Sequence, residues 1–338
     1  MSIQEFRYTI CPVGNSSFLS ANREEFLQAA FEKRGVKPTL LQSLPRDQWH
    51  VHFDYQDPAL FREGGNIPPI WAKSNDADVV LIGLAFLPHR TFLLVRNDSN
   101  VDSVEQLRGL RLGVPVNADA IIDFYRATVE HGFETALAAR GVAAAEVEFT
   151  HLSANVSFSS GSPDHKGNLG QVEADALKAG KVDAIFAGGV FAQRLLATGE
   201  FKPIYELSAD PELVLPINNS YPNTLTVSRQ LAEEAPEIVV EYVKQTLLAA
   251  KWAQNHYPEV LELFTQQLHG TPGEVTTSLP INFHKHLAVN LSEQALLALE
   301  GQKRFLYDHG YLSKDFDLAK WADDRFLKAA LAEIEQDA

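Results

Sequence analysis

Short apolar runs alternate with longer amphipathic stretches through the first two thirds of the chain. The apolar runs predict buried strands over 6–10, 79–86, 91–96, 110–114, 146–152, 182–187 and 203–207. The stretches between them predict helices over 24–34, 104–107, 118–140, 172–179 and 191–197. This alternation is typical of an α/β fold with a mostly parallel sheet.

The last third of the chain is predicted to be almost wholly helical. After 223–228, the helical spacing of apolar residues predicts helices over 236–252, 259–267, 293–307 and 318–334. Two β/α units followed by a helical tail predict two lobes of mixed sheet flanked by helices, with a cleft between them. The predicted lobes are 1–96 with 222–338, and 97–221.

Charge and hydropathy exclude two classes of partner. The formal net charge is −15, whereas nucleic-acid affinity is built from Lys and Arg contacts, so no nucleic-acid partner is expected. No stretch approaches the ~20 apolar residues of a membrane span. A small anion is compatible with the charge, because one local Arg and a helix N-terminus can outweigh the global field.

The N-terminal residues 1–7 (MSIQEFR) lack the basic region, the apolar core and the cleavage site of a signal peptide. We therefore expect a cytoplasmic protein, or a periplasmic one if a leader has been removed. We also expect a monomer.

Cys11 is the single cysteine of the chain, which excludes an internal disulfide and a cysteine-based zinc cluster. It follows the predicted strand 6–10 and precedes Pro12. Ligands of open α/β sheets bind at the carboxyl ends of strands, so this position favours a functional thiol. Taken alone, a single cysteine is more often a small buried apolar side chain.

His50 and His52 are predicted to alternate along a strand, with both side chains on one face. In one interpretation His52 polarises Cys11, giving a thiolate–imidazolium pair with a depressed thiol pKa. In another, Cys11, His50 and His52 bind zinc, but no CxxC or HExxH motif supports it, and we predict no metal. A plain surface position is expected for His50.

Arg62 offers a planar fork of donors that suits a two-oxygen anion such as a sulfinate, sulfonate or carboxylate. Gly64 and Gly65 allow the backbone to approach a ligand, and the Gly65 N–H can donate a second contact. The following 67–69 (IPP) suits a helix start, whose dipole favours an anion. In isolation, a surface arginine beside an ordinary turn would explain the same residues.

Weaker signals lie elsewhere in the chain. Asn117, predicted to begin a helix, and Gly188, in the turn after a later strand, would face the cleft, although both also suit ordinary βα turns. The polar loop 153–170 would be a lid over the site or a plain excursion. Phe53 would belong to an aromatic pocket or to the core.

Two stretches resemble the nitrate/sulfonate/taurine binding-protein superfamily. The first runs through 96–99 (RNDS), 103–107 (SVEQL) and 109–114 (GLRLGV), and the second is 176–185 (ALKAGKVDAI). The resemblance implies the fold of type II periplasmic solute-binding proteins. It does not imply an activity, because this fold serves many transport proteins.

Three segments resemble a narrower family, the aryl-sulfinate desulfinases: 8–15 (YTICPVGN), 51–55 (VHFDY) and 62–69 (REGGNIPP). The family's active-site cysteine, histidine and arginine fall on Cys11, His52 and Arg62. The resemblance implies that these residues are catalytic and that no cofactor is needed. Ile10 departs from the family, in which a small polar residue precedes the cysteine.

The expected function is therefore hydrolytic desulfination of an aromatic sulfinate, with release of sulfite. Cys11 would either attack sulfur as a thiolate or protonate the ring carbon as a thiol, with His52 as base or proton relay. The main alternative is a non-catalytic binding protein for a sulfonate, nitrate or similar small anion. A pyrimidine-precursor synthase of the thiamine pathway shares the fold, but its cysteine-rich iron motif is absent.

Overall fold

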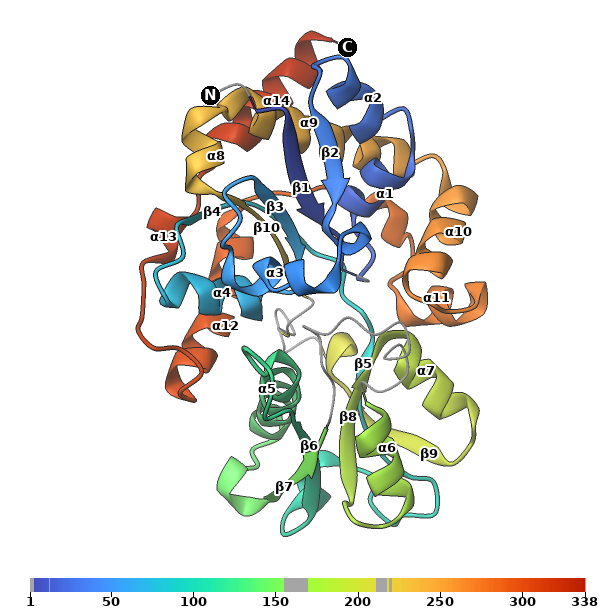
Figure 1. The fold of residues 1–338 in the computed structure, drawn as a ribbon. Helices are drawn as coiled ribbons and strands as arrows, with labels where there is room; N and C mark the ends of the chain where they lie inside the picture. Colours follow the sequence, from blue (N-terminus) through green and yellow to red (C-terminus); the bar gives the residue numbers. More distant parts are fainter. Residues whose placement is uncertain (1–2, 12, 155–169, 211–217, 219–220, 338) are drawn as a thin grey trace. The chain divides into compact units, whose positions relative to one another are not determined.

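The computed structural model describes residues 3–11, 13–154, 170–210, 218 and 221–337. The chain divides into two units, each with its own sheet and helices (Figure 1). Unit 1 comprises Met1–Leu87, Ser220–His269 and Asn282–Ala338, and unit 2 comprises Pro88–Asn219 and Gly270–Ile281.

The sheet of unit 1 has five strands in the order β2-β1-β3-β10-β4. β1 is parallel to β2 and β3, whereas β10 is antiparallel to β3 and β4. β10 comes from late in the sequence and lies between two early strands, so side chains far apart along the chain meet on β3. The strands are β1 (Glu5–Thr9), β2 (Lys37–Leu40), β3 (Leu60–Gly64), β4 (Val79–Ala85) and β10 (Asn223–Ser228).

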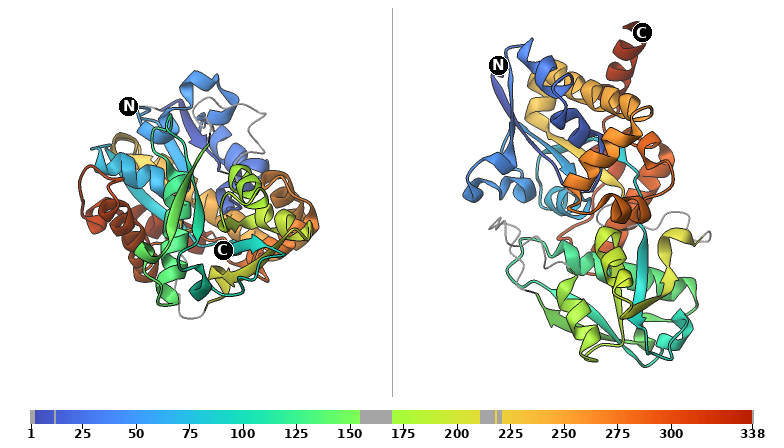
Figure 2. Two further views of the ribbon diagram at one scale, coloured as in Figure 1. Left: turned by 90° about the horizontal axis from the view of Figure 1, so that it is seen from below. Right: turned by 90° about the vertical axis from the view of Figure 1, so that its right-hand side faces the viewer.

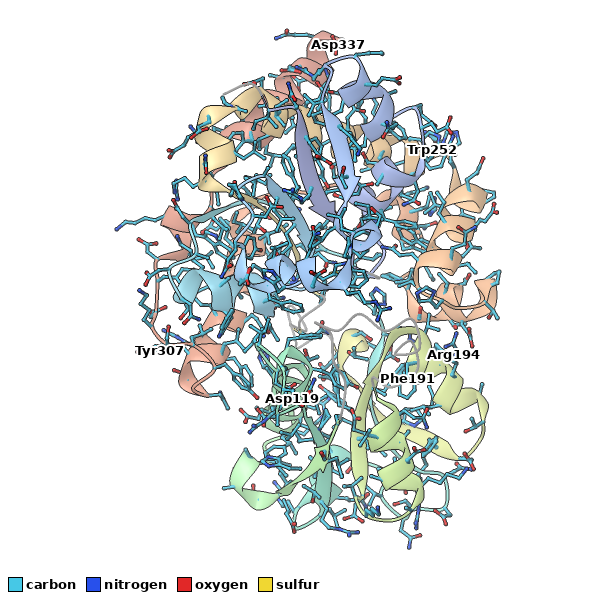
Figure 3. All side chains as sticks on the ribbon, viewed as in Figure 1. Asp119, Phe191, Arg194, Trp252, Tyr307 and Asp337 are labelled. Carbon is cyan, nitrogen blue, oxygen red and sulfur yellow. The ribbon has the colours of Figure 1, made fainter. Side chains whose placement is uncertain are left out.

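The long helix α9 packs on the sheet of unit 1 and contacts α1, α2 and α14 (Figure 2). Near its end, the guanidinium of Arg23 lies 4.2 Å above the ring of Trp252, which Figure 3 labels. The helices of this unit are α1 (Ser16–Asn22), α2 (Leu27–Glu32), α3 (Val51–Asp54), α4 (Ile67–Ser74), α8 (Arg229–Glu234), α9 (Pro236–Ala253), α10 (Tyr257–Gln267), α12 (Glu293–Asp308), α13 (Leu318–Trp321) and α14 (Arg325–Gln336).

An aromatic cluster forms the centre of the core of unit 1. Phe61 of β3 stacks on Tyr242 of α9 with ring centroids 4.1 Å apart, and Phe6 of β1 meets Phe61 edge-on at 5.0 Å. Successive residues of a strand point to opposite faces of the sheet. The face of β3 opposite Phe61 therefore carries Arg62.

The sheet of unit 2 has the order β7-β6-β8-β5-β9, with β5 antiparallel to β8 and β9. Its strands are β5 (Thr91–Arg96), β6 (Arg111–Val116), β7 (Glu148–Ser153), β8 (Ala184–Gly188) and β9 (Phe201–Glu206), and its helices are α5 (Phe124–Ala139), α6 (Gln171–Lys178), α7 (Gly189–Ala197) and α11 (Pro272–Ser278). Arg194, labelled in Figure 3, joins α7 to α11 through Glu274 at 2.9 Å. The predicted α/β class, with two mixed sheets flanked by helices, is confirmed.

The boundary between the units lies before β5, at Leu87 and Pro88, whereas the predicted first lobe extends to residue 96. β5 pairs with β8 and β9, which assigns it to the second sheet. The segment Gly270–Ile281 also joins unit 2, where the Arg90 N–H donates to the Ser278 carbonyl at 2.9 Å. A strand pattern predicts that a segment pairs, but it does not identify the sheet in which it pairs.

Two predicted helices differ from those observed. The helix expected over 118–140 begins at Phe124, because the Asp123 side chain accepts the Arg126 N–H and caps it there. The helix expected over 318–334 is divided into α13 and α14. Between them, Ala322 is extended and the Asp323 N–H donates to the Leu81 carbonyl of β4 at 2.9 Å. A hydrogen bond to the edge strand β4 thus replaces a helical hydrogen bond at Asp323.

Among the described residues, no helix is both long and apolar enough to span a bilayer.

Phe61→Ala should lower the free energy of unfolding by about 3–5 kcal/mol, because it deletes a buried ring that stacks on Tyr242. Urea unfolding measures the loss. Tyr307→Ala, at a side chain that is 47% exposed, is the control and should change stability by about 0.5 kcal/mol or less. Equal losses in the two variants would contradict the core assigned here.

Candidate active site

Cys11 lies just beyond β1, and its sulfur is pressed against the backbone of Gly64 at the end of β3. A Cβ atom built on Gly64 would lie 2.2 Å from Cys11 Sγ and 2.9 Å from Cys11 Cβ. Any side chain at this position would displace the thiol, so the close approach requires glycine. The backbone of β3 is therefore one wall of the site.

His52 lies on α3, and its Nε2 is 3.7 Å from Cys11 Sγ, within hydrogen-bonding distance for sulfur. The strand predicted for His50 and His52 is wrong. A four-residue segment is too short for apolar alternation to separate a strand from a helix. Here Tyr55, in the left-handed conformation, ends the helix.

His50 contacts a carboxylate of its own helix. Its Nδ1 contacts Asp54 Oδ2 at 2.7 Å, one helical turn further along. The two histidines therefore do not share a face, as the zinc interpretation required. Within the part of the chain that the structure describes, no group of three or more His, Cys, Asp or Glu side chains could hold a metal ion.

Arg62 is 1% exposed and is held on all sides by the protein. Nε donates to the His52 carbonyl at 3.2 Å, and Nη2 donates to His52 Nε2 at 3.1 Å. Nη1 donates to the Gly65 carbonyl at 2.7 Å and to Thr224 Oγ1 at 3.3 Å. Among the described residues these contacts use four of the five N–H groups of the guanidinium, and one, on Nη2, is left for a ligand. The expected two-pronged contact from Arg62 alone is thus not available.

None of these partners of Arg62 is anionic. Within the described residues, the buried guanidinium therefore has no ionic contact. A buried charge without a counter-ion is costly, and an anion bound beside it would remove that cost. Nη2 lies 3.6 Å from the Cβ position of Gly64, on the side where the Cys11 sulfur also lies.

The partners of His52 define its tautomer. Arg62 Nη2 can only donate, so His52 Nε2 accepts and the ring proton is on Nδ1. Burial and then the charge of Arg62 hold the pKa of His52 well below 6.5. His52 Nδ1 is buried and has no hydrogen-bond partner among the described residues, so its N–H is unused.

Burial disfavours charge on the thiol as well. Burial raises the pKa of Cys11 from 9.0, and it outweighs the opposing effects of the Arg62 charge and of the Gly65 backbone N–H at the sulfur. Burial therefore acts against both charges of the expected thiolate–imidazolium pair, which stays a prediction. The directions of these two pKa shifts favour a thiol and a neutral imidazole beside the guanidinium of Arg62.

Glu63 lies on the other face of β3, toward Ser17 of α1 and Tyr242 of α9. It is 0% exposed, and neither carboxyl oxygen has a close hydrogen-bond partner among the described residues. Burial raises its pKa to about 7, against the opposing effects of Ser17 and Arg62. Glu63 therefore titrates near neutral pH directly behind the site.

Sequence reasoning missed the supporting residues on β10. Thr224 Oγ1 bridges Arg62 Nη1 and the Gly64 carbonyl, the latter at 3.2 Å. Thr226 Oγ1 donates to the Arg62 carbonyl at 3.2 Å and meets the Tyr55 hydroxyl at 2.7 Å. The Thr-x-Thr alternation in a buried strand is a signal that places two hydroxyls on one face.

The other predicted site residues have mixed positions. Phe53 is buried beside His52, with ring centroids 5.0 Å apart. Asn117 and Gly188 belong to unit 2. Asn117 does not begin a helix but donates its N–H to Asp123 at 2.7 Å, and Gly188 is the N-cap residue of α7. In the 153–170 loop, 155–169 lie outside the described residues.

No protein-family model matches the chain. The curated 2'-hydroxybiphenyl-2-sulfinate desulfinase of Rhodococcus erythropolis is 29% identical over 357 residues, covering 96% of this chain and 93% of that protein. The desulfinase of Rhodococcus qingshengii matches to the same extent.

Solved structures of a desulfurization enzyme and of a sulfonate-binding protein are also similar to this chain. A variant of the desulfurization enzyme DszB in complex with biphenyl-2-sulfinic acid has a TM-score of 0.76 at 25% identity, over 98% of this chain and 100% of that one. DszB itself has a TM-score of 0.75 at 27% sequence identity, over 98% of this chain and 99% of that one. The sulfonate-binding protein SsuA of Methylobacillus flagellatus has a TM-score of 0.73 at 17% sequence identity, over 98% of this chain and 95% of that one. The predicted periplasmic-binding-protein-like fold is confirmed.

Alkylation by iodoacetamide tests the neutral thiol, because Cys11 is the single cysteine. The reagent reacts with thiolates, so the rate should climb only above pH 9, reflecting the raised pKa. A short cysteine peptide, titrating near ~8.5, is the control. A rate that is already at its plateau at pH 7 would instead indicate a stabilised thiolate.

Glu63→Gln tests the buried acid through stability. Because the folded pKa of about 7 exceeds the ordinary 4.5, the stability linked to this proton is complete below pH 4.5 and is lost as the pH rises through 7. Between pH 5 and 8 the free energy of unfolding of the glutamine variant should therefore rise relative to that of the native protein, by at most about 3 kcal/mol. Urea unfolding at each pH measures the gain.

The exposed Glu259→Gln is the matched control and should show no such gain. A difference between Glu63→Gln and the native protein that stays constant from pH 5 to 8 would argue against a raised pKa for Glu63.

Proposed function

We propose that this protein is a desulfinase that hydrolyses an aromatic sulfinate to the arene and sulfite, with Cys11, His52 and Arg62 as its catalytic residues. The reaction is ArSO2⁻ + H2O → ArH + HSO3⁻. It consumes one water, exchanges no electrons with a cofactor and moves one proton to carbon. The curated relatives named as sulfinate desulfinases support this reaction class.

The observation that carries the proposal is the buried charge of Arg62, which makes no ion pair among the described residues, next to a thiol. Arg62 Nη2 and Cys11 Sγ lie around the same His52 nitrogen, at 3.1 and 3.7 Å. An anionic group that enters here meets a cation whose other donors are already fixed by the protein. Such a preorganised charge binds an anion without rearranging at the moment of reaction.

Two donors near the thiol are suited to the sulfinate oxygens. The remaining N–H of Arg62 is a side-chain donor, and the Gly65 N–H is a backbone donor next to the sulfur. A charge-assisted contact from Arg62 would contribute most to affinity. The proposed contact thus combines one donor from each of two residues, in place of two donors from one guanidinium.

The protonation states favour the thiol as proton donor. The Cys11 S–H gives its proton to the ring carbon that bears sulfur, the C–S electron pair returns to the ring, and SO2 leaves. Water adds to SO2 to give bisulfite, and the proton released restores the thiol. Neutral His52 lies close enough to relay that proton.

The nucleophilic route stays open but needs a thiolate. Cys11 would attack the sulfinate sulfur, expel the aryl group with a proton, and form a thiosulfonate-type intermediate that water resolves. Burial raises the pKa of Cys11 and lowers that of His52, so transfer of the thiol proton to His52 is unfavourable before substrate binds.

Sulfite release from a panel of aryl and alkyl sulfinates tests the proposal. The native protein should turn over aryl members, and Cys11→Ser should lose about 10²–10⁴-fold in kcat, because the proton donor is replaced by a weaker acid. Arg62→Lys should raise KM and lower kcat, since one ammonium cannot make the same contacts. Arg34→Lys is the control for this change, because Arg34 pairs with Glu241 away from the site.

If no sulfinate of the panel releases sulfite, and ligands shift the melting temperatures of the native and Cys11→Ser proteins equally, the proposed enzymatic function is wrong. The non-catalytic anion-binding protein would then be the better description.

A further inference from the structure

Two glutamine side chains hold the backbone at Cys11. Gln42 Nε2 donates to the Ile10 carbonyl at 2.9 Å, and Gln267 Nε2 donates to the Cys11 carbonyl at 2.8 Å. Gln42 lies in the 3-10 turn after β2, and Gln267 is the last residue of α10. Two distant parts of unit 1 thus meet at one dipeptide.

These carbonyls need partners because β1 ends at Thr9, so the sheet provides no ladder bond for Ile10 and Cys11. The Val13 N–H, at 2.9 Å, is the second donor to the Cys11 carbonyl. A carbonyl only accepts, so each amide must present its NH2 group to the backbone. Both Oε1 atoms are then buried without a partner among the described residues, which is a cost that the donated bonds must offset.

We propose that Gln42 and Gln267 are positioning residues for Cys11, acting through the backbone to hold its sulfur between His52 and Gly64. The tolerance of this placement is small, since the sulfur is in contact with the Gly64 backbone on one side and lies 3.7 Å from His52 on the other. Misplacement of a reacting group by about 1 Å can cost as much as 10²-fold in rate. The effect on turnover rests on the proposed desulfinase function.

Gln267→Met and Gln42→Met remove the N–H donors and keep the side-chain volume. We expect each variant to lower kcat about tenfold or more with KM changed less than about threefold, because the thiol moves while Arg62 still binds the anion. Gln245→Met is the matched control, since Gln245 is equally buried at 7% exposure but donates to Glu241. Unchanged kcat in both site variants would overturn the proposal.

Gln267→Glu separates hydrogen bonding from packing. A protonated carboxyl can still donate to the Cys11 carbonyl, whereas a carboxylate cannot. The kcat of this variant relative to the native protein should therefore recover severalfold as the pH falls from 8 to 5.5, whereas the ratio for Gln267→Met should stay constant. Parallel pH profiles for the two variants would overturn the proposal.

Alkylation of Cys11 provides a readout that needs no substrate. At pH 9, the iodoacetamide rate constant should differ from the native value by about threefold or more in Gln267→Met and Gln42→Met, but not in Gln245→Met. If the native protein releases no sulfite, the desulfinase proposal fails while this comparison still decides the positioning role. Equal rate constants in all four proteins would overturn it. If Gln267→Met fails to fold, the half-buried Gln42→Met carries the same test.

Discussion

The buried guanidinium of Arg62 connects three segments of unit 1 through hydrogen bonds. Arg62 points away from the aromatic core and is held by the carbonyls of His52 and Gly65 and by a hydroxyl of β10. Each of these contacts fixes a segment around the charge: the short helix α3, the turn after β3, and the strand that returns late in the chain. Since none of them is anionic, the segments are placed without neutralising the guanidinium. The charge that organises the site is thus also available to a ligand.

The electrostatics of this site follow from burial more than from pairing. Charge is disfavoured on Cys11 and His52 because burial partly removes both from water, and Arg62 lowers the pKa of the imidazole further. A cysteine–histidine pair in a polar, exposed setting would give a thiolate nucleophile. The same pair beside a buried cation gives a thiol that can donate its proton and an imidazole that can accept one. Glu63, buried behind the strand, adds an acid whose pKa is raised to about 7.

The approach of Cys11 to Gly64 shows how the fold and the chemistry depend on each other. Ligands of this class of sheet meet strand ends and helix starts, and such a fold by itself serves binding as readily as catalysis. A thiol at the end of β1 becomes a reacting group only if the neighbouring strand leaves room for it and the backbone around it is held. Glycine at the end of β3 provides the room. The side-chain amides of Gln42 and Gln267 hold the backbone.

The sequence by itself determined the α/β alternation and most of the helices, because hydrophobic periodicity is a local property, and its resemblance to a family made Cys11, His52 and Arg62 the candidates for the site. It did not mark β2 and β3 as strands. It misassigned the segment around His52, where four residues are too few to separate helix from strand. Only the tertiary structure decided which sheet takes β5, which hydroxyls of β10 contact Arg62, and that burial disfavours charge on the thiol and the imidazole. These depend on strand pairing and on exclusion of water by side chains distant in sequence, and neither is encoded in any one segment.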